Sequence, residues 1–366
     1  MAAPDYILDP NGDVIIALRC SDSPFPLLPF KEVLPAWENP PKKATDEMTE
    51  KENKRKREPL EQLVRLQVSS AHLLLRSPYF KKALEGPFIE SHATTAGLRH
   101  IDAEGWDKDA LLLVMRIFHG QNRLVPRNLD LEMLAKVAVI VDYYQCHEVV
   151  EPFAEIWHLE IQNSSVPNSI GRDLLLLLFV SWVFRWAERF MVATKIALNK
   201  SNGPLSTMGL PIPERIICKD AIMTSLWRSL INTVLAVIDG RRREALTKTR
   251  LLLENTLKHF TKRDPDCSEA CASLQLGTLW RCLTYQKEFQ IHTVRDNGLI
   301  GYSIESVVKA LEMRAVEITL PEWDNGYGKM KPNRHSCRFG FDSIFRAEMV
   351  SLQNLEGLGL ESFTPS

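Results

Sequence analysis

The sequence lacks several features that would reveal a function directly. Its 366 residues carry 45 Lys and Arg against 46 Asp and Glu, which gives a formal net charge of −1. A chain with so little excess charge has no overall field that would attract nucleic acid or an anionic membrane. The seven cysteines are an odd number, and the first residues contain neither the basic nor the apolar segment of a secretory signal. We therefore expect an intracellular protein, in the nucleus, the cytoplasm or both, with reduced thiols.

Catalytic motifs and long apolar runs are missing as well. The sequence contains no Walker A loop, no G-x-S-x-G, no H-E-x-x-H and no G-x-G-x-x-G. Its most apolar stretch runs from Leu174 to Phe184, which is shorter than the roughly 20 residues needed to span a bilayer. We therefore predict a buried helix at this stretch, a protein without membrane association and without enzymatic activity, and no cofactor apart from a structural zinc ion considered below.

The first 160 residues mix strand and helix signals. Val64, Leu66 and Val68 alternate with polar residues, which is the spacing of a half-buried strand. Ser77 followed by Pro78 is typical of a helix start, because it supplies a cap and a proline at the first helical position. In chain order, the patterns predict strands at 14–19, 63–68 and 98–101, and helices that begin at a cap on Ser69 or Ser70, at Ser77, near Trp106, after a cap on Asn128 or Asp130, and at Glu148.

Two other regions differ in character from this one. The segment 21–60 is rich in proline and charged residues, so we predict a flexible surface insertion that buries little apolar area. The region 161–366 is almost entirely helical in pattern, with an amphipathic stripe from Ile222 that we expect to stop at Gly240, and a helix capped by Ser303. No internal repeat is apparent. The sequence thus predicts an α+β fold with two domains, 1–160 and 161–366.

The ordered set of motifs resembles the BTB/POZ family. Residues 9–16 (DPNGDVII) and 68–80 (VSSAHLLLRSPYF) are similar to the core of BTB/POZ domains, and 117–120 (IFHG) with 139–148 (VIVDYYQCHE) look like the form found in filamentous fungi. The later LPIP at 210–213 and HSC at 335–337 are similar to the helical region that follows in those proteins. The resemblance implies a small mixed sheet covered by helices, followed by a mostly α-helical C-terminal region. It also implies a non-enzymatic module that recruits a protein partner or self-associates.

The same resemblance places partner contacts around the helices at 70–85 and 106–119. Two alternative functions stay open, namely a substrate adaptor of a cullin-type ubiquitin ligase and a nuclear transcriptional regulator that uses the basic cluster in the insertion. A basic cluster in the insertion is a predicted nuclear-import signal, whereas nucleic-acid binding is not expected, because base readout needs an element positioned in a groove. The residues expected at the partner interface are His72, Tyr79, Phe80, Trp106, Leu113 and Ile117, and those of the import signal are Lys54, Arg55, Lys56 and Arg57.

A set of cysteines and histidines near the C-terminus could hold a metal. Cys267 and Cys271 are four residues apart and would share one face of a helix. With His335 and Cys337 they would make a tetrahedral set of three thiolates and one imidazole, which suits structural zinc. The spacings differ from the C-x₂-C pairs of common zinc modules, so unrelated residues are the alternative.

Overall fold

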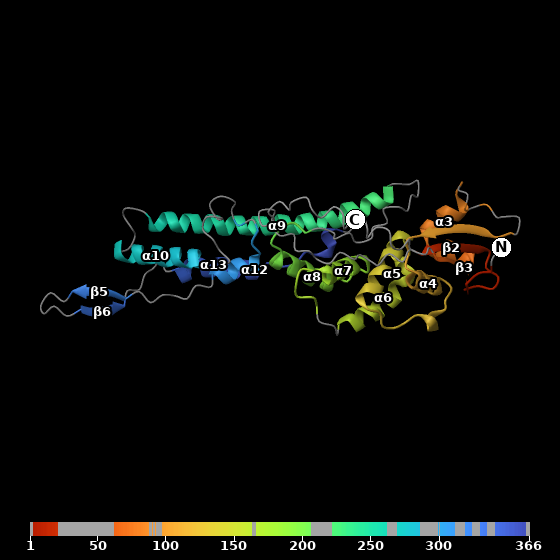
Figure 1. Cartoon of the computed structure of the whole chain (residues 1–366), viewed down its shortest axis with the longest axis horizontal. Coiled ribbons are helices and arrows are strands. Elements are labelled where there is room, and N and C mark those ends of the chain that lie inside the picture. The colour runs from red at the N-terminus through yellow and green to blue at the C-terminus, as the bar shows by residue number, and fades with distance from the viewer. Residues whose placement is uncertain are drawn as a thin grey trace, which may run out of the picture. The chain divides into compact units, whose positions relative to one another are not determined.

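The computed structural model describes residues 3–20, 62–87, 90, 92, 97–162, 166–205, 222–261, 269–285, 299, 301–311, 319–323, 330–334 and 341–363. The protein is α+β and mostly helical, with a small four-stranded mixed sheet (Figure 1). The fold class predicted from the sequence is confirmed at this level. The chain forms two compact units, of which unit 1 extends to Ala193, and unit 2 is built mainly from Asn232–Ser362 with a segment that begins at Thr194. Unit 1 therefore continues past the boundary predicted at residue 160.

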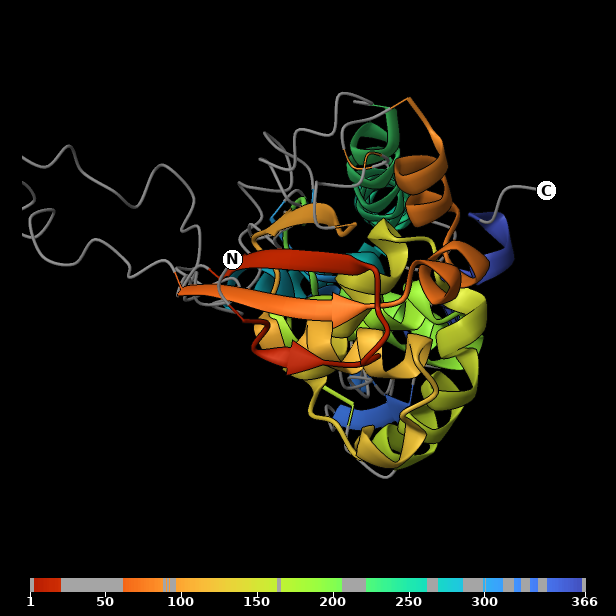
Figure 2. The same cartoon turned by 90° about the vertical axis from the view of Figure 1, so that its right-hand side faces the viewer.

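The sheet of unit 1 has the strand order β1-β3-β2-β4. The central strand β2 (Val14–Cys20) is antiparallel to β3 (Gln62–Val68) and parallel to β4 (Arg99–Glu104), while the short β1 (Tyr6–Ile7) runs parallel to β3. Figure 2 shows β2 in red and β3 in orange, side by side. The predicted strands at 14–19 and 63–68 are each one residue shorter than β2 and β3. β4 starts one residue later than predicted and extends three residues further, and β1 was not predicted.

The core of unit 1 begins at this sheet. Val14, Ile16 and Leu18 of β2 are fully buried, and burial of each such side chain contributes roughly 1.5–3 kcal/mol relative to exposure. The turn before β2 requires glycine, because a Cβ on Gly12 would lie 2.6 Å from the carbonyl oxygen of Val68. Asn11-Gly12, just before β2, therefore forms a turn at which the backbone approaches the end of β3 closely.

Helices make up the rest of unit 1. α4 begins at a cap on Asp107, and α5 at a cap on Asp130, whose Oδ1 accepts a hydrogen bond from the amide of Met133 at 2.7 Å. The choice that the sequence left between Asn128 and Asp130 is thus settled in favour of Asp130. The elements are α2 (Ser70–Arg76), α3 (Pro78–Glu85), α4 (Lys108–Phe118), the 3₁₀ helix η2 (Asn122–Leu124), α5 (Leu131–Tyr143), α6 (His147–Gln162), α7 (Arg172–Val183) and the first half of α8 (Ala187–Lys200), whose second half belongs to unit 2.

The apolar stretch identified in the sequence forms α7, as predicted. Each of the five leucines from Leu174 to Leu178 is at most 5 % exposed. The helix has 12 residues and packs against α5. Within the described parts of the chain, no helix is both long enough and apolar enough to cross a membrane.

The turns between α5 and α6 and between α7 and α8 have the same backbone geometry. Gln145 in the first turn and Arg185 in the second have positive φ angles of 52° and 57° and lie 40 residues apart. In both turns the next amide donates to the carbonyl five residues earlier, at 3.0 and 2.7 Å, which is a Schellman-type closure. The side chains of the two helix pairs differ at most positions, so no internal repeat is apparent in the sequence.

Arg185 allows a test of this turn. Its side chain is exposed, and a left-handed backbone costs a non-glycine residue roughly 1–2 kcal/mol. We expect Arg185→Gly to raise the free energy of unfolding by about 0.5–1 kcal/mol, because glycine removes this strain but adds entropy to the unfolded chain. Urea denaturation would measure the change. Glu155→Gly, at an exposed position inside α6, is the matched control and should lower stability by about 1 kcal/mol; equal losses in both variants would contradict the account.

Unit 2 contains long helices and a hairpin. The predicted helix cap at Ser303 is confirmed, since its Oγ accepts a hydrogen bond from the amide of Ser306 at 3.1 Å. The hairpin was not predicted, because Pro321 and Pro332 lie opposite each other in its two strands and proline argues against a strand. The described elements after α8 are α9 (Ile222–Phe260), α10 (Glu269–Tyr285), α12 (Ile304–Leu311), β5 (Thr319–Trp323), β6 (Met330–Arg334), α13 (Phe341–Gln353) and the 3₁₀ helix η3 (Leu360–Ser362).

A buried ion pair lies on α9 just after Gly240, where the sequence predicted a helix end. Arg242 is 1 % exposed, and its Nη2 lies 2.9 Å from Oδ1 of Asp239. Its Nη1 donates to the carbonyl of Tyr302 at 3.1 Å, which joins α9 to the segment before α12. The helix therefore continues through Gly240, because contacts such as that between Arg242 and Tyr302 outweigh the low helix propensity of one glycine.

Candidate interaction surface

The corner between α2 and α3 is anchored inside unit 1 by Ser77. Its buried hydroxyl oxygen accepts a hydrogen bond from the amide of Phe80 at 3.2 Å and donates one to the carbonyl of Tyr144 at 2.6 Å. The first bond caps α3, with Pro78 at its first position as the sequence predicted. The second bond joins the corner to the end of α5. The direction of α3 is therefore fixed relative to α5.

An aromatic cluster surrounds this corner. The Phe80 ring stacks on Tyr144 with centroids 4.5 Å apart, and the Tyr79 ring meets Tyr143 at 5.0 Å. The indole Nε1 of Trp106 donates to the hydroxyl of Tyr144 at 3.2 Å. Such aromatic pairs contribute about 0.5–1.5 kcal/mol beyond the area that they bury. The cluster thus holds α3 and the segment before α4 against the end of α5.

Four of the six residues predicted at the partner interface lie in the core instead. The resemblance to BTB/POZ domains placed them at an interface, but an apolar side chain on one face of a helix also fits an inward face. Their side chains pack within unit 1 and offer a partner no surface, so we correct their assignment from interface to core. The other two, His72 and Tyr79, are half-buried. The four core residues are Phe80, Trp106, Leu113 and Ile117, which are between 0 and 5 % exposed.

The side of α2 and α3 that faces solvent combines an apolar group with basic groups. Leu75 is 80 % exposed, more than any other large hydrophobic residue in the described ranges. The two helices carry three basic residues, Arg76, Lys81 and Lys82, against one acidic residue, the exposed Glu85 at the end of α3. This composition suits a protein partner that offers an apolar contact with an acidic rim. We define the α2–α3 surface as Leu75, Arg76, Pro78, Lys81 and Lys82.

The residues that fix the start of α2 were missed by the sequence analysis. The carboxylate of Asp13 accepts hydrogen bonds from the amide and the hydroxyl of Ser70, at 2.8 and 2.7 Å. The amide of Ser69 donates to Nε2 of His119 at 3.0 Å, whereas the Ser69 side chain, a predicted cap, makes no capping bond. Burial would raise the pKa of Asp13, but the hydrogen bonds from Ser70 outweigh it and lower this pKa. The partners are 57 and 50 residues apart in sequence, so no local pattern marks them.

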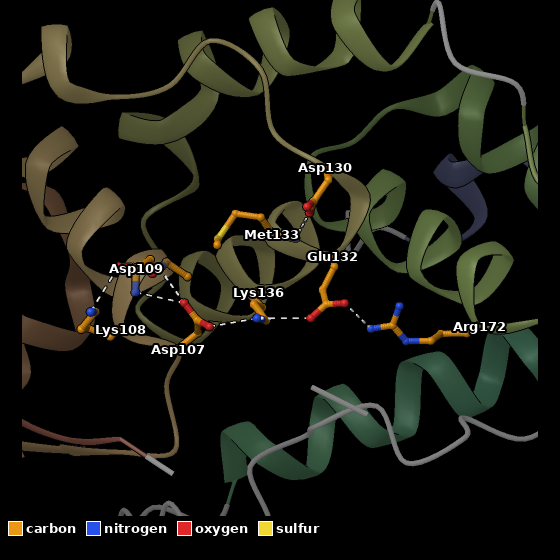
Figure 3. A network of polar contacts seen from close by, with 9 residues as sticks. Asp107, Lys108, Asp109, Asp130, Glu132, Met133, Lys136 and Arg172 are labelled. Atoms are coloured by element: carbon orange, nitrogen blue, oxygen red, sulfur yellow. Dashed lines mark hydrogen bonds and ion pairs between the residues drawn. The ribbon is translucent and has the colours of Figure 1, made fainter. Parts of the chain in front are cut away.

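A chain of ion pairs joins α4, α5 and α7 (Figure 3). Nζ of Lys136 lies 2.9 Å from Oδ2 of Asp107 and 3.3 Å from Oε1 of Glu132. Nη2 of Arg172 lies 2.7 Å from Oε2 of the same glutamate. Cations and carboxylates alternate along the chain, so each charge has an opposite neighbour. The network therefore connects the start of α4 to α5, and α5 to the start of α7.

The pKa values in this network favour its charged form. Burial would raise the pKa of Asp107, but hydrogen bonds, first from Lys136, outweigh it and lower the pKa. The hydrogen bond from Arg172 is the largest influence on Glu132 and lowers its pKa. Burial would lower the pKa of Lys136, yet the two carboxylates outweigh it and raise the pKa. The carboxylates thus contribute stability above their ordinary pKa values of 3.8 and 4.5, and the lysine below 10.5, so the network is intact at neutral pH.

The buried thiol of unit 1 is not suited to nucleophilic chemistry. Burial raises the pKa of Cys146, and its Sγ lies 3.6 Å from the carbonyl of Val141. Since the thiolate is the nucleophile, a raised pKa suppresses reactivity. Burial also raises the pKa of the nearby Asp142 carboxyl, against the opposing effect of His147 at 3.5 Å.

Two predicted sites fall where the structure gives no side-chain description. The import signal Lys54–Arg57 and three zinc candidates, Cys267, His335 and Cys337, lie outside the described residues. Cys271 belongs to α10, but its side chain is not described. Within the described residues, no group of three or more His, Cys, Asp or Glu could hold a metal ion. Both sites stay predictions.

These features define an α+β protein, mostly helical, whose first unit holds a four-stranded mixed sheet with a helical corner between β3 and β4. Comparison with known proteins found no matching family model, no matching curated protein and no matching solved structure. The function proposed below therefore rests on the residues and the geometry of this chain.

Proposed function

We propose that this chain is a non-enzymatic protein-interaction module of the BTB/POZ type, which recruits a protein partner or self-associates. One observation carries the proposal: the strand order and directions around β2, with α2 and α3 between β3 and β4. The segments with the sequence resemblance, 9–16 and 68–80, supply the turn before β2, the end of β3, and both of these helices. Sequence pattern and topology thus support the same reading, because they coincide on the same residues.

The partner would bind the α2–α3 surface. Leu75 projects an apolar side chain into solvent, and the exposed Lys81 and Lys82 follow on the next helix. The two helices are rigidly backed by the Ser77 hydrogen bonds and the aromatic cluster, so little ordering entropy would be lost on binding.

The test compares two exposed leucines in the full-length protein. We expect Leu75→Asp to reduce recovery of the specific partner from native cell extract at least about tenfold, which corresponds to a hot spot of about 1.4 kcal/mol or more. Leu251→Asp, at a 46 % exposed position on α9, is the matched control and should retain the partner. Quantitative mass spectrometry of the co-purified proteins gives the ratio.

The identity of the partner whose recovery depends on Leu75 would decide between the two more specific functions that the sequence left open. A cullin scaffold would favour a substrate adaptor of a ubiquitin ligase, and a transcriptional co-regulator would favour a nuclear regulator. If only the chain itself is recovered, light scattering should show a dimer that Leu75→Asp dissociates. A monomer with no Leu75-dependent partner would refute binding at this surface.

A further inference from the structure

His119, at the end of α4, has both ring nitrogens committed. Its Nδ1 lies 2.8 Å from the carbonyl oxygen of Met115, which can only accept a hydrogen bond. Its Nε2 lies 3.0 Å from the amide of Ser69, which can only donate one. The ring must therefore carry its proton on Nδ1 and be neutral. A second proton would go on Nε2, directly against the amide that precedes α2.

His72, on α2, stacks on the His119 ring and lies beside the positively charged guanidinium of Arg76. The two ring centroids are 5.0 Å apart, and the planes are within 5° of parallel. Nδ1 of His72 lies 2.9 Å from the carbonyl oxygen of Phe118 and 3.0 Å from Nη1 of Arg76. A carbonyl needs a donor and a guanidinium needs an acceptor, so this nitrogen satisfies one of them at a time. A charged His119 would thus face an imidazole that already lies beside a cation.

We propose that the stacked pair His72–His119 is an acid-sensitive latch, which holds the first turn of α2 against the end of α4 at neutral pH and releases it when His119 gains a second proton. Release breaks the bond to the Ser69 amide, while Asp13 still holds Ser70. The element that loosens is the one that carries Leu75. The latch is a property of the fold and does not depend on the proposed partner binding.

The electrostatics give the direction of the effect. Burial is the largest influence on the pKa of His119 and lowers it, and the charges of His72 and Arg76 act in the same sense. The hydrogen bond to Met115 and the Asp9 carboxylate oppose this without reversing it. The closed latch therefore binds a proton less readily than the open one, whose histidine titrates near the ordinary 6.5. The closed state is fully favoured above this pH and loses stability as the pH falls below it.

Amide hydrogen exchange of the full-length protein at pH 7.5, 6.5 and 5.5 tests the latch. With one linked proton, we expect the protection factor of the Ser69 amide to fall below pH 6.5 by at most about tenfold per pH unit, whereas the Ser70 amide, which Asp13 still holds, should stay protected. In His119→Gln the side-chain oxygen can still accept from the Ser69 amide but does not titrate, so protection should not change with pH. His100→Gln, on β4, is the control and should keep the wild-type response.

Two results would overturn the proposal. One is wild-type protection that does not change with pH; the other is an equal fall in the wild type and in His119→Gln. If that variant does not fold, ¹⁵N spectra of the wild-type imidazoles decide the matter alone. We expect a neutral His119 with its proton on Nδ1 at pH 7, and a charged ring, or a proton on Nε2, refutes the latch.

Discussion

Replacing Phe80 by alanine is expected to lower the free energy of unfolding of unit 1 by about 3–5 kcal/mol. Its side chain is 0 % exposed, with the ring stacked on Tyr144 and edge-on to Phe118 at 6.2 Å. Truncation removes these contacts and leaves a cavity beside the corner of α2 and α3. Urea denaturation followed by circular dichroism would measure the loss.

A neighbouring surface position provides the control for this prediction. Leu75→Ala, on the exposed side of α2, should change stability by no more than about 0.5 kcal/mol. The pair separates the two interpretations of this region, because a core residue affects folding and an interface residue affects binding. If Phe80→Ala lowered the free energy of unfolding only slightly but reduced partner recovery, Phe80 would be an interface residue, as the resemblance to BTB/POZ domains had predicted.

Replacing Arg242 by alanine is expected to destabilise unit 2 by about 3–5 kcal/mol. The guanidinium is 1 % exposed and bridges Asp239 and the carbonyl of Tyr302, so its removal leaves a largely buried carboxylate with less compensation. Hydrogen exchange in α9 and α12 would show the loss as faster opening of both helices.

Arg243 offers a control that shares the same carboxylate. Its Nε lies 3.0 Å from Oδ2 of Asp239, but its side chain is 61 % exposed. Because solvent screens this pair, Arg243→Ala should cost no more than about 1 kcal/mol. Replacing Arg242 by Met and Asp239 by Leu together should recover most of the stability, since an apolar pair can substitute for a buried ion pair. Equal effects of the two arginines would show that burial does not govern this site.

The sequence predicted the elements of unit 1 better than those of unit 2. A continuous apolar run located β2, and alternating apolar residues located β3, each to within a residue. The hairpin β5–β6 has a proline in each strand and escaped notice. α9 was expected to end at Gly240, whereas the contacts of Arg242 come from a segment 60 residues away, which no local window can include.

The sequence predicted the helices of the α2–α3 surface but not the side chains on their exposed side. The predicted helices at 70–85 are present, but the side chains chosen on them were apolar ones that fold inward, such as Phe80. An outward leucine and an inward leucine look alike in sequence, so Leu75 was not singled out. The contact of His119 with the Ser69 amide depends on a pairing across 50 residues and becomes visible only in three dimensions.

The turns at Gln145 and Arg185 also bear on which substitutions these two corners can accept. Both turns have the same backbone hydrogen bonds, although the residues in them differ. Cys146 in one turn and Trp186 in the other follow the residue with positive φ, and both are buried. A thiol and an indole thus occupy equivalent backbone positions, so the backbone closure of the corner does not require one particular side chain there.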